Sequence, residues 1–314
     1  MEPRNQTEGS YLLLMVFSDF SWMKSVLPVV FLAIYLVTIV GNLLLIFLQR
    51  IDPRLHTPMY FFLSHLSFID ICSTTTIAPK MIANYFTEDK SISYTACAIQ
   101  MFVALTLGAT ECLLLAIMAY DRHVAICQPL RYNVIMSRRT CFLLAASCWI
   151  SSIVNSLFHT VFTFWWSFCR SKEIKHFFCE IQPLLRLSCA DTRMHEMWLF
   201  ATVTIIAACS SLLTLVSYIH IIATILRIHS SEGKSRVFST CSSHLLVVII
   251  FYGPIMSIYL RPISSYTSER DRVITMLYTV LIPMCNPLIY AMRNKDVKGA
   301  MKKAMEQTCH SLRK

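Results

Sequence analysis

The stretch VLPVVFLAIYLVTIVGNLLLIFL, residues 26–48, contains no charged side chain and few polar ones. An α-helix rises about 1.5 Å per residue, so roughly 20 apolar residues cross the ~30 Å hydrocarbon core of a bilayer. The stretch is long enough for one crossing. It therefore predicts a membrane-spanning helix near the start of the chain.

Six more windows of this kind follow, separated by more polar segments. They cover residues 58–83, 98–120, 140–162, 197–225, 237–260 and 273–292. Over all 314 residues, 55% are hydrophobic and 15% are charged, which is typical of a chain surrounded by lipid rather than by water. We predict an all-α membrane protein with one domain, a seven-transmembrane helix bundle. Its divisions are an N-terminal segment 1–25, the bundle 26–292 and a tail 293–314.

The Lys and Arg side chains predict the orientation of this bundle. If the N-terminus is extracellular, the inner segments hold 16 of the 28 Lys and Arg residues but only five of the 18 acidic residues. An excess of Lys and Arg marks the cytoplasmic side of a membrane protein. The sequon Asn5-Gln6-Thr7 agrees, because glycosylation at Asn5 requires an extracellular N-terminus. We expect a multi-pass plasma-membrane protein with a cytoplasmic C-terminus.

The formal net charge of +10 raises the question of a nucleic-acid partner. The basic residues instead gather at the predicted inner membrane surface, where they either face lipid and water or form a docking surface for an acidic partner. We expect the lipid membrane, and no nucleic acid, among the partners. The motifs HExxH, CxxC and GxxxxGK[ST] are absent, as are the paired half-sequences of many transporters. The sequence therefore predicts neither an enzyme nor a transporter.

Two carboxyl groups, Asp70 and Glu111, fall well inside apolar windows. An ionisable group at that depth is costly unless it faces the bundle interior and has a partner. One interpretation is a polar centre, shared with Asn42 and Asn286, that holds a cation such as sodium or a proton. The other is a neutral, hydrogen-bonded structural pair. Apart from sodium at this centre, we expect no metal and no cofactor.

Four cysteines are expected at the outer end of the bundle. Cys97 stands at the outer start of the third window, and Cys169, Cys179 and Cys189 lie in the loop 163–196. Cysteines on the oxidising side of a membrane favour disulfides, here two of them. The sequence alone allows three pairings. A disulfide from this loop to the third helix would hold the loop as a lid over the mouth of the bundle.

The inner end of the third window reads MAYDRHVAICQPLRY, residues 118–132, with Asp121 and Arg122 side by side. Alone, such a pair indicates only a membrane interface. Three further stretches accompany it: LHTPMYFFLSHLSFID at 55–70, KSRVFSTCSSHL at 234–245 and PMCNPLIYAMRN at 283–294. In this order they resemble the signature motifs of the odorant (olfactory) receptors, a branch of the rhodopsin-like G-protein-coupled receptor superfamily.

The sequence departs from the wider rhodopsin-like pattern at two places. Residues 251–254, FYGP, lack the tryptophan that usually precedes this proline, and the fifth window lacks a proline. Both departures fit the odorant branch. Residues 235–237, SRV, differ from that branch's own approach to Phe238. Details of activation in other receptors therefore do not transfer directly.

The resemblance implies roles for the inner half of the bundle. Asp121 and Arg122 would form an ionic lock, and Arg122 would rearrange with Tyr218 when a G protein binds. The remaining switch residues implied for helices six and seven are Tyr252, Asn286, Pro287 and Tyr290.

The resemblance also implies structural features. The disulfides would be Cys97–Cys179 and Cys169–Cys189, and Asp70 with Glu111 would form the sodium-type site. Residues 294–303 would form a short amphipathic helix on the inner membrane surface.

The outer half of the third helix indicates the class of ligand. Small molecules usually bind between the helices of a bundle, in mostly apolar cavities. No acid is present there, whereas a cationic amine would need a carboxylate to offset the desolvation of its charge. We expect a small, neutral, mostly hydrophobic volatile ligand. By family analogy the pocket residues would be Ala104, Leu105, Gly108, Ala109, Asn155, His159, Thr202, Ile206, Ile255, Tyr259, Met276 and Thr279, with packing as the alternative role for each.

The function implied by the resemblance is olfaction at the cell membrane. An odorant receptor would activate a heterotrimeric stimulatory G protein of the olfactory type and raise cyclic AMP. The alternative is a seven-helix receptor outside olfaction for another small molecule or a peptide. The uncharged outer third helix and the short N-terminal segment disfavour this alternative.

Overall fold

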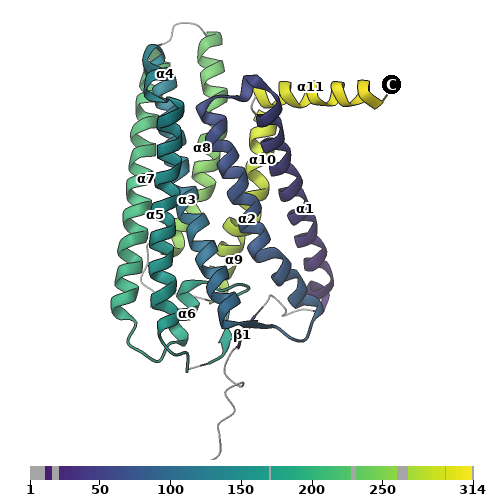
Figure 1. The fold of residues 1–314 in the computed structure, drawn as a ribbon, viewed down its shortest axis with the longest axis vertical. Helices are drawn as coiled ribbons and strands as arrows, with labels where there is room; N and C mark the ends of the chain where they lie inside the picture. The colour runs from purple at the N-terminus through teal and green to yellow at the C-terminus, as the bar shows by residue number, and fades with distance from the viewer. Residues whose placement is uncertain are drawn as a thin grey trace, which may run out of the picture.

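The long helices stand side by side as one bundle in the computed structural model, which describes residues 11–15, 21–169, 171–227, 231–259, 268–293 and 295–312 (Figure 1). The predicted seven-transmembrane bundle is confirmed. Its first six crossings are α1 Ser21–Ile51, α2 Pro58–Phe86, α3 Tyr94–Cys127, α5 Arg138–Trp165, α7 Arg193–Arg227 and α8 Ser231–Tyr259. The seventh joins α9 Ser268–Met276, the π-helical turn η4 Leu277–Leu281 and α10 Ile282–Arg293.

The crossings have the apolar lengths that a bilayer requires. Within the described residues, six helices are long and apolar enough to span a membrane, the seventh crossing among them. Helix α8 contributes a shorter apolar segment, Cys241–Ser257. The outward faces of the helices carry exposed large hydrophobic side chains, which suit lipid rather than water.

The two ends of the bundle differ in structure. At one end β1 Tyr11–Leu14 is the middle strand of a sheet, antiparallel to β2 Ser91–Ser93 and parallel to β3 Glu173–Ile174. The short helix α6 Ile181–Leu187 lies at the same end, which we call the lid end (Figure 1). The opposite end, which we call the tail end, carries the short elements η1 Pro53–Leu55, η2 Pro129–Arg131 and α4 Tyr132–Ile135, together with α11 Lys295–Leu312.

Several helices extend beyond the predicted windows because capping, not hydropathy, sets their ends. The Ser93 hydroxyl accepts a hydrogen bond from the Ala96 backbone N–H at 3.2 Å and so begins α3 at Tyr94 rather than at residue 98. The other end of α3 is Cys127, since Pro129 lacks the N–H that a continuing helix would use. Hydropathy marks only the part of a helix that lies in lipid, so several predicted windows were shorter than the helices themselves.

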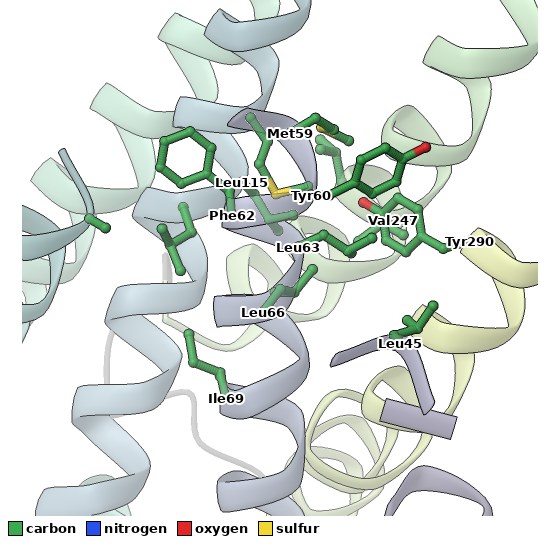
Figure 2. Packing of buried hydrophobic residues seen from close by; sticks show 14 of the residues in the cluster. Leu45, Met59, Tyr60, Phe62, Leu63, Leu66, Ile69, Leu115, Val247 and Tyr290 are labelled. Carbon is green, nitrogen blue, oxygen red and sulfur yellow. The ribbon is translucent and has the colours of Figure 1, made fainter. Parts of the chain in front are cut away.

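The core is densest in the tail-end half of the bundle. Figure 2 shows Phe62 and Leu66 of α2, Leu115 of α3, Val247 of α8 and Tyr290 of α10 packed into one buried cluster. Lipid chains are as apolar as these side chains, so the cluster stabilises the bundle through close van der Waals packing. This cluster therefore joins four crossings at the level where the switch residues were expected.

The π-helical turn in the seventh crossing was not predicted. It immediately precedes α10, whose second residue, Pro283, has no backbone N–H to complete the regular bonding pattern. The Thr279 hydroxyl donates to the Thr275 carbonyl at 2.7 Å within this wider segment. The turn carries Tyr278 and Thr279, both of which line cavities described below.

Candidate ligand cavity and switch region

A cavity of about 110 Å³ lies among α3, α5, α7, α8 and the seventh crossing. None of its lining side chains carries a formal charge. Eight of the residues expected in the pocket line it: Ala104, Leu105, Gly108, Ala109, Asn155, His159, Ile206 and Ile255. Ala104, Gly108 and Ala109 have small or no side chains, so they leave space between α3 and the facing helices α5 and α7. An ideal Cβ built on Gly108 would meet no atom within 4 Å.

A second cavity of about 60 Å³ adjoins the first and reaches the lid. The two share lining residues on α3, including Ala104 and Gly108. Phe178 and Ile181 of the lid line this second cavity, as does the buried carboxyl of Glu111. The expected pocket residue Thr279 lies here rather than in the first cavity. The two cavities therefore lie against the same part of α3, between the lid and the middle of the bundle.

His159 sits in a chain of buried hydrogen bonds. The Thr202 hydroxyl donates to the Leu199 carbonyl at 3.1 Å, which leaves its oxygen to accept from His159 Nε2 at 3.0 Å. His159 Nδ1 then accepts from His195 Nε2 at 3.1 Å, and the two rings lie nearly parallel, at 6°. These directions assign a neutral tautomer to each histidine. Thr202 thus positions His159, and neither Thr202 nor His195 lines the first cavity.

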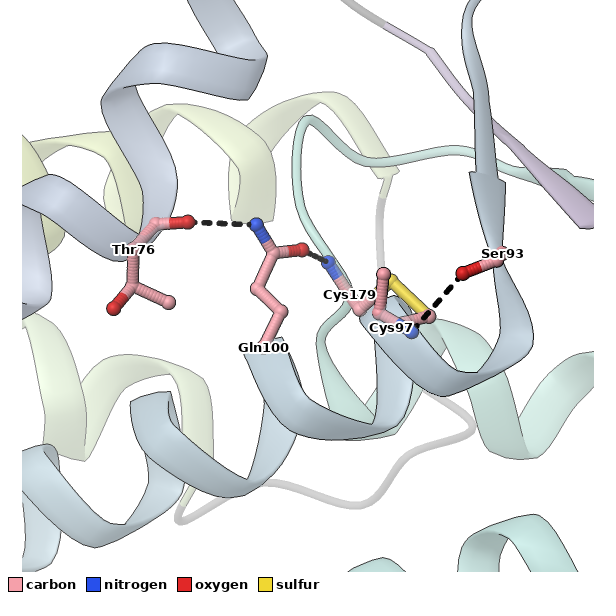
Figure 3. Close-up of a disulfide and its surroundings, with 6 residues drawn as sticks. Thr76, Ser93, Cys97, Gln100 and Cys179 are labelled. Atoms are coloured by element: carbon pink, nitrogen blue, oxygen red, sulfur yellow. Dashed lines mark hydrogen bonds between the residues drawn. A yellow bond between two sulfur atoms is a disulfide. The ribbon is translucent and has the colours of Figure 1, made fainter.

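Two disulfides fasten the lid, with the pairing that the resemblance implied. Cys97 bonds Cys179, and Cys169 bonds Cys189, with Cα atoms 5.4 and 5.6 Å apart. Figure 3 shows that Gln100 reinforces the first bond: its amide donates to the Thr76 carbonyl and its carbonyl accepts from the Cys179 backbone N–H, both at 2.9 Å. The lid is therefore tied to α3 covalently and to α2 through Gln100.

The lid also buries a histidine next to its disulfide. His176 is fully buried, and its Nε2 lies 3.1 Å from Glu180 Oε2. Burial and the nearby positive charge of Arg272 lower the pKa of His176 to about 3. The ring is therefore neutral at physiological pH, and its protonation would place an additional charge beneath the lid.

The buried acids occupy a polar centre between α2, α3 and α10. The Asn286 amide donates to both Asp70 carboxyl oxygens, at 3.2 and 3.1 Å, and Asp70 interacts electrostatically with Glu111. Asn42 of α1 donates to the Pro283 carbonyl at 3.1 Å. One oxygen on each of Glu111, Asn286 and Asn42 is buried without a hydrogen-bond partner. Unpartnered oxygens around carboxyl groups suit a small, hard cation such as sodium.

At the tail end, Arg122 is held by its neighbour in sequence. Its guanidinium donates to Asp121 Oδ2 from Nε at 3.0 Å and from Nη2 at 2.6 Å. The hydroxyl of Tyr132, on α4, donates to the other oxygen of Asp121 at 2.8 Å. Burial and the Asp121 carboxylate raise the pKa of Tyr132, so the hydroxyl keeps its proton. Both oxygens of a fully buried carboxylate are thereby satisfied.

Two tyrosines form hydrogen bonds between neighbouring helices. The Tyr218 hydroxyl of α7 lies 2.8 Å from His244 Nδ1 and 3.2 Å from the Cys241 carbonyl, both on α8. The Tyr252 hydroxyl of α8 donates to the Cys112 carbonyl of α3 at 2.9 Å. Arg122 and Tyr218 are each bonded elsewhere and not to one another.

Sequence comparison identifies the family to which this bundle belongs. A model of the family described as "Olfactory receptor" matches residues 31–308. The chain belongs to the olfactory receptor family. It is 50% identical to human olfactory receptor 8U9 over 299 residues, which are 95% of this chain and 97% of that receptor. It is 49% identical to human olfactory receptor 5G3 over 98% of each chain, and 50% identical to mouse olfactory receptor 8U3 over 91% and 89% of the respective chains.

The family assignment settles the broad class of this receptor. It is a multi-pass membrane protein. Its family is not enzymatic, and odorants are the ligands of that family. The described residues contain no group of three or more His, Cys, Asp or Glu side chains arranged to hold a metal ion. The sequon residue Asn5 and the side chain of the expected pocket residue Tyr259 lie outside the described part of the receptor.

Pro287 of α10, one of the expected switch residues, packs closely against α1. An ideal Cβ on Gly41 would lie 3.1 Å from Pro287 Cγ, so the absence of a side chain at Gly41 allows the two helices to approach closely. Tyr290 is 1% exposed, and its hydroxyl has no hydrogen-bond partner. A buried hydroxyl without a partner is costly. The Tyr290 hydroxyl is therefore an unsatisfied polar group within the bundle.

The residues predicted to line the pocket and the residues that line the cavities differ in several places. Met276, expected in the pocket, packs with Phe31 and Phe178 and lines neither cavity. Leu199, Val203 and Ala207 line the first cavity and were missed. Their spacing of four residues places them on one face of α7, and this periodicity was available in the sequence. Gln100 and Tyr132 act through contacts between separate segments, which no local pattern indicates.

Proposed function

We propose that the receptor binds a small, neutral, mostly hydrophobic volatile odorant in the first cavity and activates a stimulatory G protein of the olfactory type, which raises cyclic AMP. The uncharged lining of the first cavity carries this proposal. A charged ligand there would lose its hydration without a countercharge. Asn155 and Tyr278 provide polar groups for a carbonyl or hydroxyl of the ligand.

Two leucine substitutions test the cavity in cells that express the receptor with the olfactory stimulatory G protein. A leucine at Gly108 would extend into the cavity, since the space around an added Cβ is open. Ala208 on α7 is exposed and lines neither cavity, so Ala208→Leu is the matched control. Cyclic AMP is measured against a panel of neutral volatiles, with surface staining.

The expected result is a dose-dependent response of the unmodified receptor that Ala208→Leu retains and Gly108→Leu loses. Gly108→Leu replaces a helical glycine, which favours the helix by about 0.8–1 kcal/mol, and Ala208→Leu exchanges one good helix former for another, so both variants should fold. An undiminished response in Gly108→Leu at normal surface levels would exclude the cavity as the odorant site.

The proposed orientation places the lid end outside the cell and the tail end in the cytoplasm. Both disulfides lie at the lid end, and disulfides persist in oxidising compartments. The locked Arg122 lies at the opposite end, where a cytoplasmic G protein can reach it. Arg122→Ala should abolish the cyclic AMP response while surface staining remains measurable. A retained response would remove Arg122 from the coupling step.

The polar centre around Asp70 is proposed to hold a sodium ion. Asp70, Glu111, Asn42 and Asn286 would contribute oxygen ligands, three of which lack hydrogen-bond partners. A bound cation would offset the cost of charged carboxylates within the bundle. Exchange of sodium for N-methyl-D-glucamine should lower the thermal unfolding temperature of the purified receptor, and Asp70→Asn should remove that dependence. An equal dependence in both proteins would exclude this site.

A further inference from the structure

A groove of about 560 Å³ opens at the tail end, between the turn joining α1 to α2 and the turn joining α4 to α5. It is separate from the ligand cavities and from Arg122. His56 and Thr57 form one edge and Ser137 and Arg138 the other. The first two belong to the stretch 55–70, which helped to identify the family but has no part in the odorant or G-protein sites proposed above.

The polar part of the groove suits an anion. Arg138 and His56 are both exposed at its edges, and no acidic side chain lines it. Helices α2 and α5 both begin here, after Thr57 and Ser137 respectively. The start of a helix carries a partial positive charge and backbone N–H groups without helical partners. Two such starts and two basic side chains therefore converge on one space.

The part of the groove further along α2 and α5 is apolar. Phe61 and Phe142 line it one turn further along α2 and α5. Phe142 is 65% exposed. These two helices, both long and apolar enough to cross a membrane, begin here, at Pro58 and Arg138. In a bilayer their first turns would lie at the level of lipid headgroups, and the two phenylalanines, one turn further along, would lie closer to the acyl chains. A soluble phosphate would use only the first part of this surface, whereas a phospholipid uses both.

We propose that this groove binds an anionic phospholipid of the inner leaflet. Its headgroup lies between the starts of α2 and α5, beside Arg138 and His56, and an acyl chain follows Phe142. The assignment to the inner leaflet rests on the proposed orientation of the receptor. Asn133, which lines the groove, neighbours Tyr132, whose hydroxyl holds Asp121. A lipid in the groove thereby supports the turn that carries one contact of the inner lock.

Lipid binding to the purified full-length receptor tests this proposal without any odorant or signalling assay. The receptor, in a neutral detergent, is mixed with dioleoyl phosphatidylserine and dioleoyl phosphatidylcholine. Native mass spectrometry then counts the molecules of each lipid that remain bound. One basic residue near a membrane surface contributes enough binding energy for about a fivefold change in affinity. Arg138→Gln should therefore weaken phosphatidylserine binding about fivefold. Asn133→Asp, which adds an acid at an exposed position without removing a hydrogen bond, should weaken it similarly.

Arg139→Gln is the matched control, because Arg139 is the next residue, is also exposed and does not line the groove. It should leave binding within about twofold of the unmodified receptor, as expected for a surface charge outside the site. Equal losses in Arg138→Gln and Arg139→Gln would overturn the proposal in favour of a diffuse basic surface. Equal binding of phosphatidylcholine, or full displacement of phosphatidylserine by soluble phosphoserine, would overturn the choice of an anionic lipid. None of these outcomes bears on odorant binding.

Discussion

The lid end and the tail end of this receptor are held together in different ways. At the lid end two disulfides and a three-stranded sheet join segments that are distant in sequence. At the tail end side-chain hydrogen bonds join α3 to α4 at Asp121 and α7 to α8 at Tyr218. Covalent bonds do not exchange during signalling, whereas hydrogen bonds do. From this difference we infer that the lid end keeps one shape around the ligand cavity, whereas the tail end can exchange its hydrogen bonds during signalling.

Removal of the Cys97–Cys179 bond should have the largest effect. Loss of a native disulfide typically costs about 2–5 kcal/mol. Cys97→Ser should therefore sharply reduce surface staining and the thermal unfolding temperature of the purified receptor. The control is Cys209→Ser, which alters an exposed free cysteine on α7 and should change neither quantity. Similar behaviour of the two variants would show that the lid is not what stabilises this end.

Neutralising the lock at the tail end should affect signalling more than folding. Asp121→Asn removes the charge that binds Arg122, and hydrogen bonds to charged groups contribute roughly 1.5–3 kcal/mol. We expect higher cyclic AMP without any odorant. Asp52→Asn is the control, because Asp52 also pairs with a neighbouring arginine, Arg54, at this end but away from the α3 lock. Unchanged basal cyclic AMP in Asp121→Asn would contradict the switch.

Acid should weaken the lid end through His176. Its pKa is about 3 in the folded receptor and near 6.5 in an unfolded chain, so the unfolded state binds more protons between these values. Stability is therefore greatest above pH 6.5 and falls by up to about 1.4 kcal/mol per unit below it. Thermal unfolding at pH 7.5, 6.5 and 5.5 should show a decline that His176→Gln reduces. The same decline in His176→Gln would assign it to other groups.

The smallest effect is expected from the Tyr132 hydroxyl. Tyr132→Phe removes one hydrogen bond to Asp121 and keeps the aromatic ring, at a cost of about 1 kcal/mol. Basal cyclic AMP should rise less than in Asp121→Asn. If basal cyclic AMP is higher in the double variant Asp121→Asn, Tyr132→Phe than in Asp121→Asn alone, Tyr132 acts outside the lock.

The hydrophobic windows predicted the crossings well, because the demand for apolar length in lipid is met residue by residue along the chain. The small residues Ala104 and Gly108 likewise indicated space on one face of α3, since their spacing follows the helix. Strand β1 could not be predicted: Tyr11–Leu14 is a short apolar segment, and both of its partners lie far away in sequence. Asp121 and Tyr132 are joined by a turn whose conformation no local pattern specifies.

Amide hydrogen exchange on the purified receptor, with and without an agonist from the volatile panel, tests the comparison of the two ends most directly. The account predicts that the agonist speeds exchange in the tail-end halves of α7 and α8 and leaves the strands β1 to β3 and α6 as protected as before. Faster exchange in those lid-end elements, with no change at the tail end, would contradict it.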